Sequence, residues 1–232
     1  MKGIIFVLHG RKKTIASANL KVVEKIASKL TLPYEIGLLE GEFQTLEAAI
    51  HSLERKAVTA IVFVPILLFP ATHAKEDLPE RAEKAIKEKI PYQILPTLGT
   101  TKAIKNHLIQ AIRQASFPEA EVVLISHGTP HYSEPFQQLT ELAKEIQTVL
   151  NLPVYPACYH GDHQYSELLK TKEHPLIIQR LFLSEGYLAK KIKQEIIESR
   201  NNEDILLPTL QDSDALAAAI MERLEEAECI QS

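Results

Sequence analysis

Three side chains that can bind a divalent metal ion follow predicted β-strands in the first half of the chain. His9 comes directly after the apolar run Gly3–Leu8, Glu40 follows a second apolar segment, and His73 lies a few residues beyond a third. The carboxyl ends of neighbouring parallel strands meet at one edge of a sheet, so these residues would converge there. Two imidazoles and one carboxylate suit a divalent first-row metal ion, and three protein ligands leave coordination positions open for a substrate.

Each of these residues also has a structural interpretation. A single histidine at a strand end more often forms a local hydrogen bond than it ligates a metal ion, and only the convergence of three such positions favours the metal site. Glu42, close to Glu40, is expected to be solvated. The basic residues Arg11, Lys12 and Lys13 either form a solvated loop or attract an anionic substrate to the site.

The elements that must position these residues alternate between strand-like and helix-like segments. Continuous apolar runs rich in β-branched residues predict strands, and apolar residues at helical spacing predict the helices between them. The predicted strands of the first half are 3–8, 34–39, 60–68 and 92–95, and the predicted helices are 15–30, 46–53, 79–88 and 101–115. This alternation implies right-handed crossovers and a parallel sheet with helices on both faces.

An internal duplication becomes visible where the pattern restarts near residue 117. Three landmarks recur in order at offsets of 118, 120 and 112 residues: Val7–Gly10 with Ile125–Gly128, Leu32–Glu42 with Leu152–Asp162, and Leu95–Leu98 with Leu207–Leu210. The expected fold is therefore α/β with two similar Rossmann-like lobes, residues 1–116 and 117–232, each a small parallel sheet flanked by helices. We expect the first lobe to carry the metal site and the second, a degenerate copy, to complete a cleft.

The second lobe departs from the ligand set of the first. Its residues at the positions of the three predicted ligands are His127, His160 and Tyr187. A phenol is a poor ligand near neutral pH because it must ionise from a pKa of about 10. Two alternatives remain open: a weaker second metal site formed by His127, His160 and His163, or a cluster in which these residues and His131 hydrogen-bond the carboxylates of a ligand.

Composition excludes several classes of function. The chain has 232 residues, 45% hydrophobic and 24% charged, and its net charge of −4 comes without a basic stripe, so no nucleic-acid partner is expected. The apolar stretch at residues 60–71 is shorter than the roughly 20 residues that span a bilayer, and the N-terminal segment predicts a strand rather than a signal peptide. No glycine-rich phosphate-binding motif occurs. Two distant cysteines, Cys158 and Cys229, indicate a reducing compartment, so we expect a cytoplasmic protein without a membrane partner.

Three segments of the sequence resemble the sirohydrochlorin chelatases, class II chelatases that insert a divalent metal ion into the tetrapyrrole sirohydrochlorin. These segments are Leu8-His9-Gly10-Arg11, Leu38-Leu39-Glu40 and Val64–Pro79, whose end, His73-Ala74-Lys75-Glu76-Asp77-Leu78-Pro79, is the most specific part. The resemblance covers essentially the whole chain, because the long form of the family has two homologous lobes. One departure is that the family usually has Gly-His-Gly-Ser-Arg at the first segment.

The resemblance implies a site and an activity. It places the two active-site histidines at His9 and His73 and the metal-binding glutamate at Glu40, with the macrocycle between two lobes of a chelatase-like fold. Metal ion and tetrapyrrole are both substrates, so no further cofactor is implied. The favoured activity is Fe²⁺ insertion, the last step of siroheme synthesis; the alternatives are cobalt insertion for cobalamin synthesis, a non-catalytic tetrapyrrole or metal carrier, and a structural α/β protein. Two lobes in one chain predict a working monomer.

Overall fold

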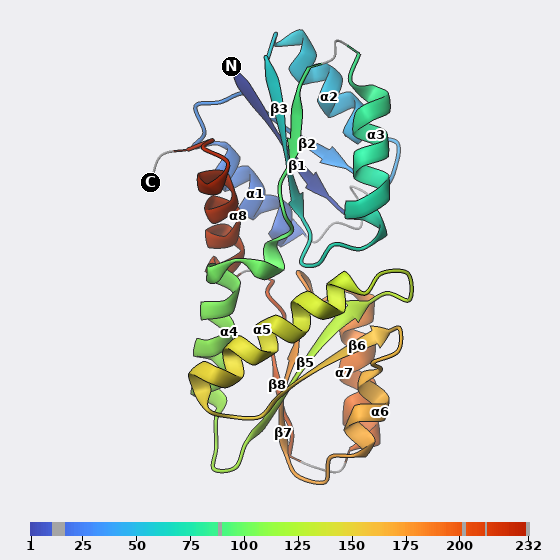
Figure 1. Ribbon diagram of the computed structural model, residues 1–232, viewed down its shortest axis with the longest axis vertical. Coiled ribbons are helices and arrows are strands. Elements are labelled where there is room, and N and C mark those ends of the chain that lie inside the picture. Colours follow the sequence, from blue (N-terminus) through green and yellow to red (C-terminus); the bar gives the residue numbers. More distant parts are fainter. Residues whose placement is uncertain (11–16, 88–89, 201–202, 212, 231–232) are drawn as a thin grey trace. The chain divides into compact units, whose positions relative to one another are not determined.

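Two four-stranded parallel sheets form the framework of the protein (Figure 1). The computed structural model describes residues 1–10, 17–87, 90–200, 203–211 and 213–230, so Arg11, Lys12 and Lys13 lie outside the described residues. The first sheet has the order β2-β1-β3-β4 and the second the order β6-β5-β7-β8. The strands are β1 (Lys2–Leu8), β2 (Tyr34–Leu38), β3 (Ala60–Ile66), β4 (Tyr92–Ile94), β5 (Glu121–Gly128), β6 (Val154–His160), β7 (Leu176–Arg180) and β8 (Ile205–Leu207). The repeated order confirms the predicted α/β fold with two similar lobes.

Helices cover both faces of each sheet, as right-handed crossovers require. They are α1 (Ser17–Ala27), α2 (Leu46–Arg55), α3 (Leu78–Ala85), α4 (Lys102–Ala115), α5 (Glu134–Leu150), α6 (Tyr165–Lys170), α7 (Tyr187–Ser199) and α8 (Asp214–Glu226). In Figure 1, α2 and α3 lie on one face of the first sheet and α1 and α8 on the other, while α6 and α7 lie opposite α4 and α5 on the second. None of the described helices is long and apolar enough to cross a membrane.

The central strand β1 shows why a continuous apolar run predicts a strand in this fold. Ile5 and Val7 belong to the core that packs against α2 and α3. Ile4 and Phe6 are also fully buried, and because side chains alternate along a strand they face the opposite helix layer. A strand buried on both faces needs apolar residues at every position.

The duplication extends to the loops at the strand ends. The backbone is in the left-handed region at four corresponding glycines, with φ of 101° at Gly10, 93° at Gly41, 69° at Gly128 and 96° at Gly161. Each second strand also closes its following loop in the same way. The Leu38 N–H donates to the Gln44 carbonyl at 2.8 Å, and the Cys158 N–H donates to the His163 carbonyl at 2.7 Å.

The last helix of each lobe groups with the other lobe. The two compact units are Met1–Thr101 with Leu216–Ser232, and Lys102–Ala215, which differs from the predicted division into residues 1–116 and 117–232. Within the second unit, Lys105 on α4 forms a 2.6 Å ion pair with Glu145 on α5. Within the first unit, Arg223 on α8 donates two hydrogen bonds to the Thr97 carbonyl. Helical periodicity predicts that α4 and α8 bury an apolar face, but it does not specify which sheet that face covers.

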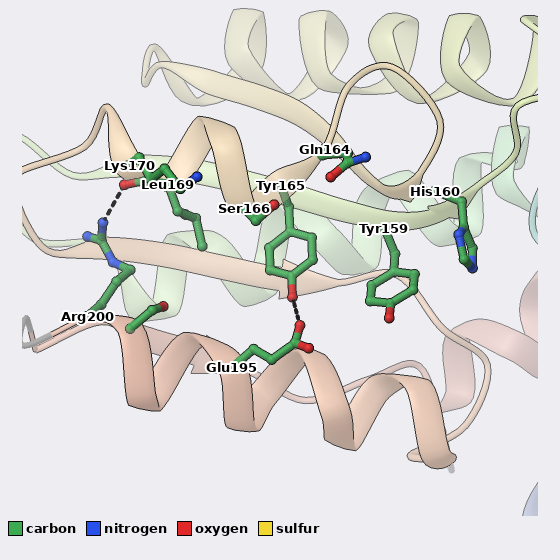
Figure 2. Close-up of a pocket in the computed structure, with 10 residues that line it drawn as sticks. Tyr159, His160, Gln164, Tyr165, Ser166, Leu169, Lys170, Glu195 and Arg200 are labelled. Atoms are coloured by element: carbon green, nitrogen blue, oxygen red, sulfur yellow. Dashed lines mark hydrogen bonds between the residues drawn. The ribbon is translucent and has the colours of Figure 1, made fainter.

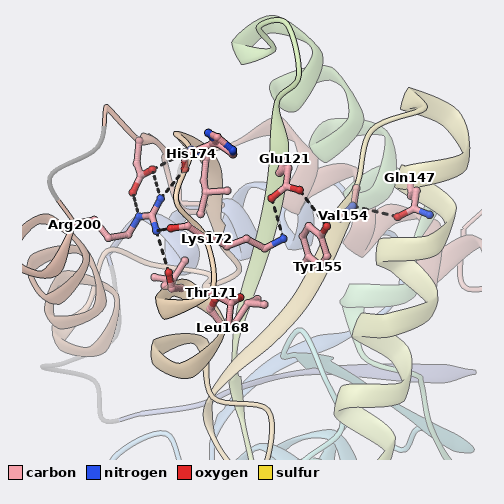
Figure 3. A network of polar contacts seen from close by, with 12 residues as sticks. Glu121, Gln147, Val154, Tyr155, Leu168, Thr171, Lys172, His174 and Arg200 are labelled. Atoms are coloured by element: carbon pink, nitrogen blue, oxygen red, sulfur yellow. Dashed lines mark hydrogen bonds and ion pairs between the residues drawn. The ribbon is translucent and has the colours of Figure 1, made fainter.

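A polar network fastens the amino-terminal edge of the second sheet (Figure 3). The nearly buried Arg200 side chain pairs with Asp204 and also donates to the carbonyls of Leu169, Lys172 and His174. Asp204 in turn accepts the backbone N–H of Leu176, the first residue of β7. The network therefore joins the end of α7, the strand β7 and the loop after α6.

Candidate metal site

The register of the first sheet brings two of the predicted ligands to one edge. Leu8, the last residue of β1, pairs with Leu38 of β2 on one side and with Ile66 of β3 on the other. His9 and Glu40 follow Leu8 and Leu38 by one and two residues, so both leave the sheet at its carboxyl edge. This is the edge at which parallel α/β sheets bind ligands.

A tight turn holds Glu40 in place after β2. The Leu39 N–H donates to the Leu8 carbonyl at 3.0 Å, which keeps the chain paired with β1 for one more residue. At Gly41 the chain then reverses with φ of 93°, in the left-handed region that residues with a Cβ adopt only with strain. The Glu40 side chain is thereby presented beside His9.

His73 lies in a short π-helical turn, His73–Asp77, which leads directly into α3. The Leu78 N–H closes this turn by donating to the His73 carbonyl. The Nδ1 atom of His73 lies 2.6 Å from Oδ2 of Asp77, four residues further on. A carboxylate can only accept a hydrogen bond, so in the neutral imidazole this contact favours the proton on Nδ1 and leaves the lone pair of Nε2 for a metal ion. Single π-helical turns occur frequently at functional sites.

The three predicted ligands converge. One ligand atom from each of His9, Glu40 and His73 lies within 4.8 Å of the other two, and no other group of three metal-binding side chains meets this criterion in the part of the chain that the structure describes. The His9 and His73 rings are 4.3 Å apart between centroids, and His9 Nδ1 lies 3.4 Å from Glu40 Oε1. The side chains are 37–48% exposed, so an ion can reach them from solvent.

Two charged residues, Asp77 and Arg81, adjoin the site, and the sequence pattern alone predicts no role for either. Asp77 contacts His73, and Arg81 donates to the Leu39 carbonyl at 2.7 Å and to both carboxylate oxygens of Glu47 at 2.6 and 2.8 Å. The hydrogen bonds from Arg81 lower the pKa of Glu47 to about 2, and Glu47 raises the pKa of Arg81. The signal that could have found these residues is the i, i+4 spacing that places His73, Asp77 and Arg81 on one face.

The corresponding edge of the second sheet has a different arrangement. The His127 and His160 rings are 5.1 Å apart between centroids, but His163 stacks on Phe136 at 3.7 Å, and Tyr187 is 82% exposed. The pKa of His160 is lowered by burial and by the positive charges of His127 and Lys191. Among the described residues, the three histidines proposed for a second metal site do not form a three-ligand group.

A cavity of about 520 Å³ lies in the second unit between α6 and α7 (Figure 2). The Tyr165 hydroxyl crosses it to donate to Glu195, and the pKa of Tyr165 is raised by burial and by this carboxylate. Ser166 and Gln164 add hydroxyl and amide groups to the lining, and His160 lies at one end. The cavity includes none of the three converging ligands of the first unit.

Comparisons with known proteins agree with this architecture. A family model described as CbiX matches the chain twice, over residues 3–115 and 121–227, so each half separately has the features of that family. A sirohydrochlorin ferrochelatase of Priestia megaterium is 25% identical over 211 residues, which cover 84% of this chain and 78% of that protein. A sirohydrochlorin cobaltochelatase of Saccharolobus solfataricus is 30% identical over 123 residues, 49% of this chain and 95% of that protein.

A solved structure shares the whole fold. The structure described as SirB from Bacillus subtilis with Fe³⁺ superposes with a TM-score of 0.85 over 97% of this chain and 94% of that one, at 22% identity. At this identity the likeness establishes the fold. The likeness extends across both sheets, because it covers 97% of this chain.

Proposed function

The chain belongs to the CbiX family, and from this premise we propose that it is an enzyme that inserts a divalent metal ion, Fe²⁺, into sirohydrochlorin, the last step of siroheme synthesis. The observation that supports this most directly is the convergence of His9, Glu40 and His73 at the carboxyl edge of the first sheet. The metal ion and the tetrapyrrole are then both substrates, and no further cofactor is required.

The side chains suit the steps that insertion requires. Two pyrrole protons must leave the macrocycle while the ion loses water ligands. A neutral imidazole can accept a proton near pH 7 because its pKa is close to that value, so His9 and His73 share metal delivery and proton abstraction. Glu40 holds the ion and balances its charge. Three ligands form an incomplete shell, which allows the ion to pass to the macrocycle nitrogens.

Cobalt insertion is the second candidate activity. Two imidazoles and a carboxylate bind Co²⁺ more strongly than Fe²⁺ in the Irving–Williams order, so the donor set itself does not discriminate against cobalt. Relatives named sirohydrochlorin ferrochelatase and relatives named sirohydrochlorin cobaltochelatase both match the chain. Those named ferrochelatase match over 84% of it, compared with 49% for those named cobaltochelatase, and this favours Fe²⁺ as the substrate.

The cellular setting that we propose is the cytoplasm, with the chain acting as a monomer. Cys158 and Cys229 are both free and buried, and burial raises the pKa of each thiol, so neither is activated for disulfide exchange. The duplication supplies two lobes within one chain, which removes the need for a second copy.

The test is anaerobic absorbance spectroscopy of sirohydrochlorin mixed with Fe²⁺, or separately with Co²⁺, with and without the protein. We expect the protein to accelerate the loss of the free-macrocycle spectrum and His73→Ala to reduce the rate about 100-fold or more. His174→Ala, which removes an exposed histidine of the second unit, is the matched control and should retain the rate. A spectral shift without acceleration would identify a carrier, and no change with either metal would refute the proposal.

A further inference from the structure

A line of three charged or metal-binding side chains runs along one face of the π-helical turn and α3. His73, Asp77 and Arg81 follow one another at i, i+4 and i+8, a spacing that places neighbours on the same side of a helix. The first contact in the line is the 2.6 Å hydrogen bond between His73 Nδ1 and Asp77 Oδ2. The second is electrostatic, since Asp77 is among the charges that raise the pKa of Arg81.

Arg81 connects this line to the other side of the site. Its Nη1 atom donates to the carbonyl of Leu39, the residue immediately before Glu40. Its Nε and Nη2 atoms donate to the two carboxylate oxygens of Glu47 on α2, a bidentate arrangement that fixes the plane of the guanidinium. One cation therefore contacts the backbone beside Glu40 and lies close enough to Asp77, the carboxylate that contacts His73, to interact with its charge.

From these contacts we propose that Asp77 and Arg81 are positioning residues that hold His73 and Glu40 in the geometry that binds the metal ion. The proposal rests on the function proposed above only in taking these two residues as metal ligands. Asp77 orients the His73 ring and keeps the proton on Nδ1, so that Nε2 faces the ion. Arg81 anchors the turn that carries Glu40 and offsets the negative charge of Asp77.

The physical reason is the coupling between a ligand and the group behind it. A metal-binding histidine whose other nitrogen donates to a carboxylate has a fixed tautomer and a fixed ring plane, and its free nitrogen is more basic. Losing such a partner typically weakens metal binding about 10- to 100-fold. The His73 side chain is 37% exposed, so packing restrains its ring only in part and the hydrogen bond to Asp77 matters more for its orientation.

The second lobe provides an internal comparison. In the alignment that pairs His73 with Tyr187, the positions of Asp77 and Arg81 are occupied by Lys191 and Glu195, so both charges are reversed. Lys191 donates to the Tyr159 hydroxyl at 2.6 Å, and Glu195 accepts from Tyr165 across the cavity of Figure 2. The second lobe, which has Tyr187 in place of the third ligand, thus also lacks the two supporting charges. This is expected if the charges of Asp77 and Arg81 serve the metal-binding role of His73.

The test is Co²⁺ binding without sirohydrochlorin, followed by the visible absorption of the bound ion, which reports both affinity and coordination geometry. We expect Asp77→Asn and Arg81→Met to weaken binding about 10- to 100-fold and to change the spectrum. Glu83→Gln removes a carboxylate from an exposed position of α3 and is the matched control, with unchanged binding. Wild-type affinity and spectrum in both variants would overturn the proposal.

A measurement on the unmodified protein covers the case in which a variant fails to fold. With Zn²⁺ as a diamagnetic probe, the ¹⁵N chemical shifts of the His73 ring should show a protonated Nδ1 and a metal-bound Nε2. Metal binding through Nδ1 would contradict the proposal. These experiments contain no tetrapyrrole, so they are independent of catalysis: a protein that binds Co²⁺ through these groups but never accelerates insertion would refute the enzyme and leave the positioning network intact.

Discussion

The imidazole rings of His9 and His73 lie 4.3 Å apart at an interplanar angle of 36°, although one follows β1 and the other begins the turn before α3. At this separation the two rings can share one ion, and Glu40 completes the set with an oxygen ligand. We therefore expect the loss of any one of these three side chains to weaken the binding of a divalent metal ion.

Metal stoichiometry is the first expected outcome. Equilibrium dialysis with Co²⁺ should find one tightly bound ion per chain, because the described residues form one three-ligand group. His9→Ala should weaken this binding at least about tenfold, since one of three ligands is lost. His127→Ala, at the repeat position of His9, is the control and should leave affinity and stoichiometry unchanged. Two ions per chain, with one lost in His127→Ala, would instead establish a second site.

The turn after β2 leads to a prediction about backbone conformation. Gly41→Ala introduces a Cβ at φ of 93°, and we expect it to lower the free energy of unfolding by about 1–2 kcal/mol in urea titrations and to weaken Co²⁺ binding by displacing Glu40. Gly186→Ala is the matched control. The backbone at Gly186 has φ of −76°, and an added Cβ would meet only Ser184 Oγ at 3.5 Å, an ordinary contact. Equal effects of the two substitutions would show that the left-handed turn is not required.

The ion pair between Glu47 and Arg81 predicts a pH dependence of stability. The pKa of Glu47 is about 2 in the folded protein, below its ordinary value of 4.5, because Arg81 donates to its carboxylate. A depressed pKa stabilises the folded state above pH 4.5, and this contribution is lost as the pH falls through 2.

Urea unfolding of Glu47→Gln and wild type measures this contribution. Because both side chains are partly exposed, we expect the difference in free energy of unfolding to be about 1 kcal/mol at pH 7 and to shrink below pH 4.5. Glu83→Gln should differ little from wild type at either pH. A difference for Glu47→Gln that is constant from pH 7 to pH 3 would contradict the assignment.

The polar network of Figure 3 should be important for folding. Asp204→Ala leaves the nearly buried Arg200 guanidinium without its carboxylate and removes the acceptor of the Leu176 N–H. Breaking a buried ion pair typically costs about 3–5 kcal/mol, and we expect a loss of this size in thermal or urea unfolding. Glu203→Ala, which removes an exposed carboxylate one residue earlier, should change stability by less than about 0.5 kcal/mol. A similar small effect of Asp204→Ala would show that Arg200 is adequately held by carbonyl groups.

The framework and the convergence of His9, Glu40 and His73 could be predicted because their signals are local. Apolar runs such as that of β1 identify doubly buried strands, and the repeated landmarks around His9 and His127 reveal the duplication. The predicted strand at 60–68 extends too far, because the structure ends β3 at Ile66. The carbonyls of Leu67 and Leu68 instead accept the N–H groups of Leu98 and Gly99, a pairing that no local pattern reveals.

The supporting contacts of the site could not be derived in the same way. Asp77 belongs to the segment His73–Pro79 that carries the family resemblance. Its contact with His73, however, depends on the π-helical turn, which hydrophobic periodicity does not indicate. In the sequence, Arg81 is one of several charged residues of an amphipathic helix, and nothing distinguishes it from the others. Its contact with the Leu39 carbonyl exists only because α3 packs beside the end of β2, so it is a product of tertiary structure.

The placement of α8 has a consequence for biosynthesis. Arg223 of this helix donates to Thr97 and Thr100 of the first unit, yet α8 follows the entire second unit in the chain. On the ribosome, the first unit therefore cannot gain its final helix until every residue of the second has been translated. The unit that contains His9, Glu40 and His73 therefore starts first and finishes last, and its first sheet must await α8 before one of its faces is fully covered.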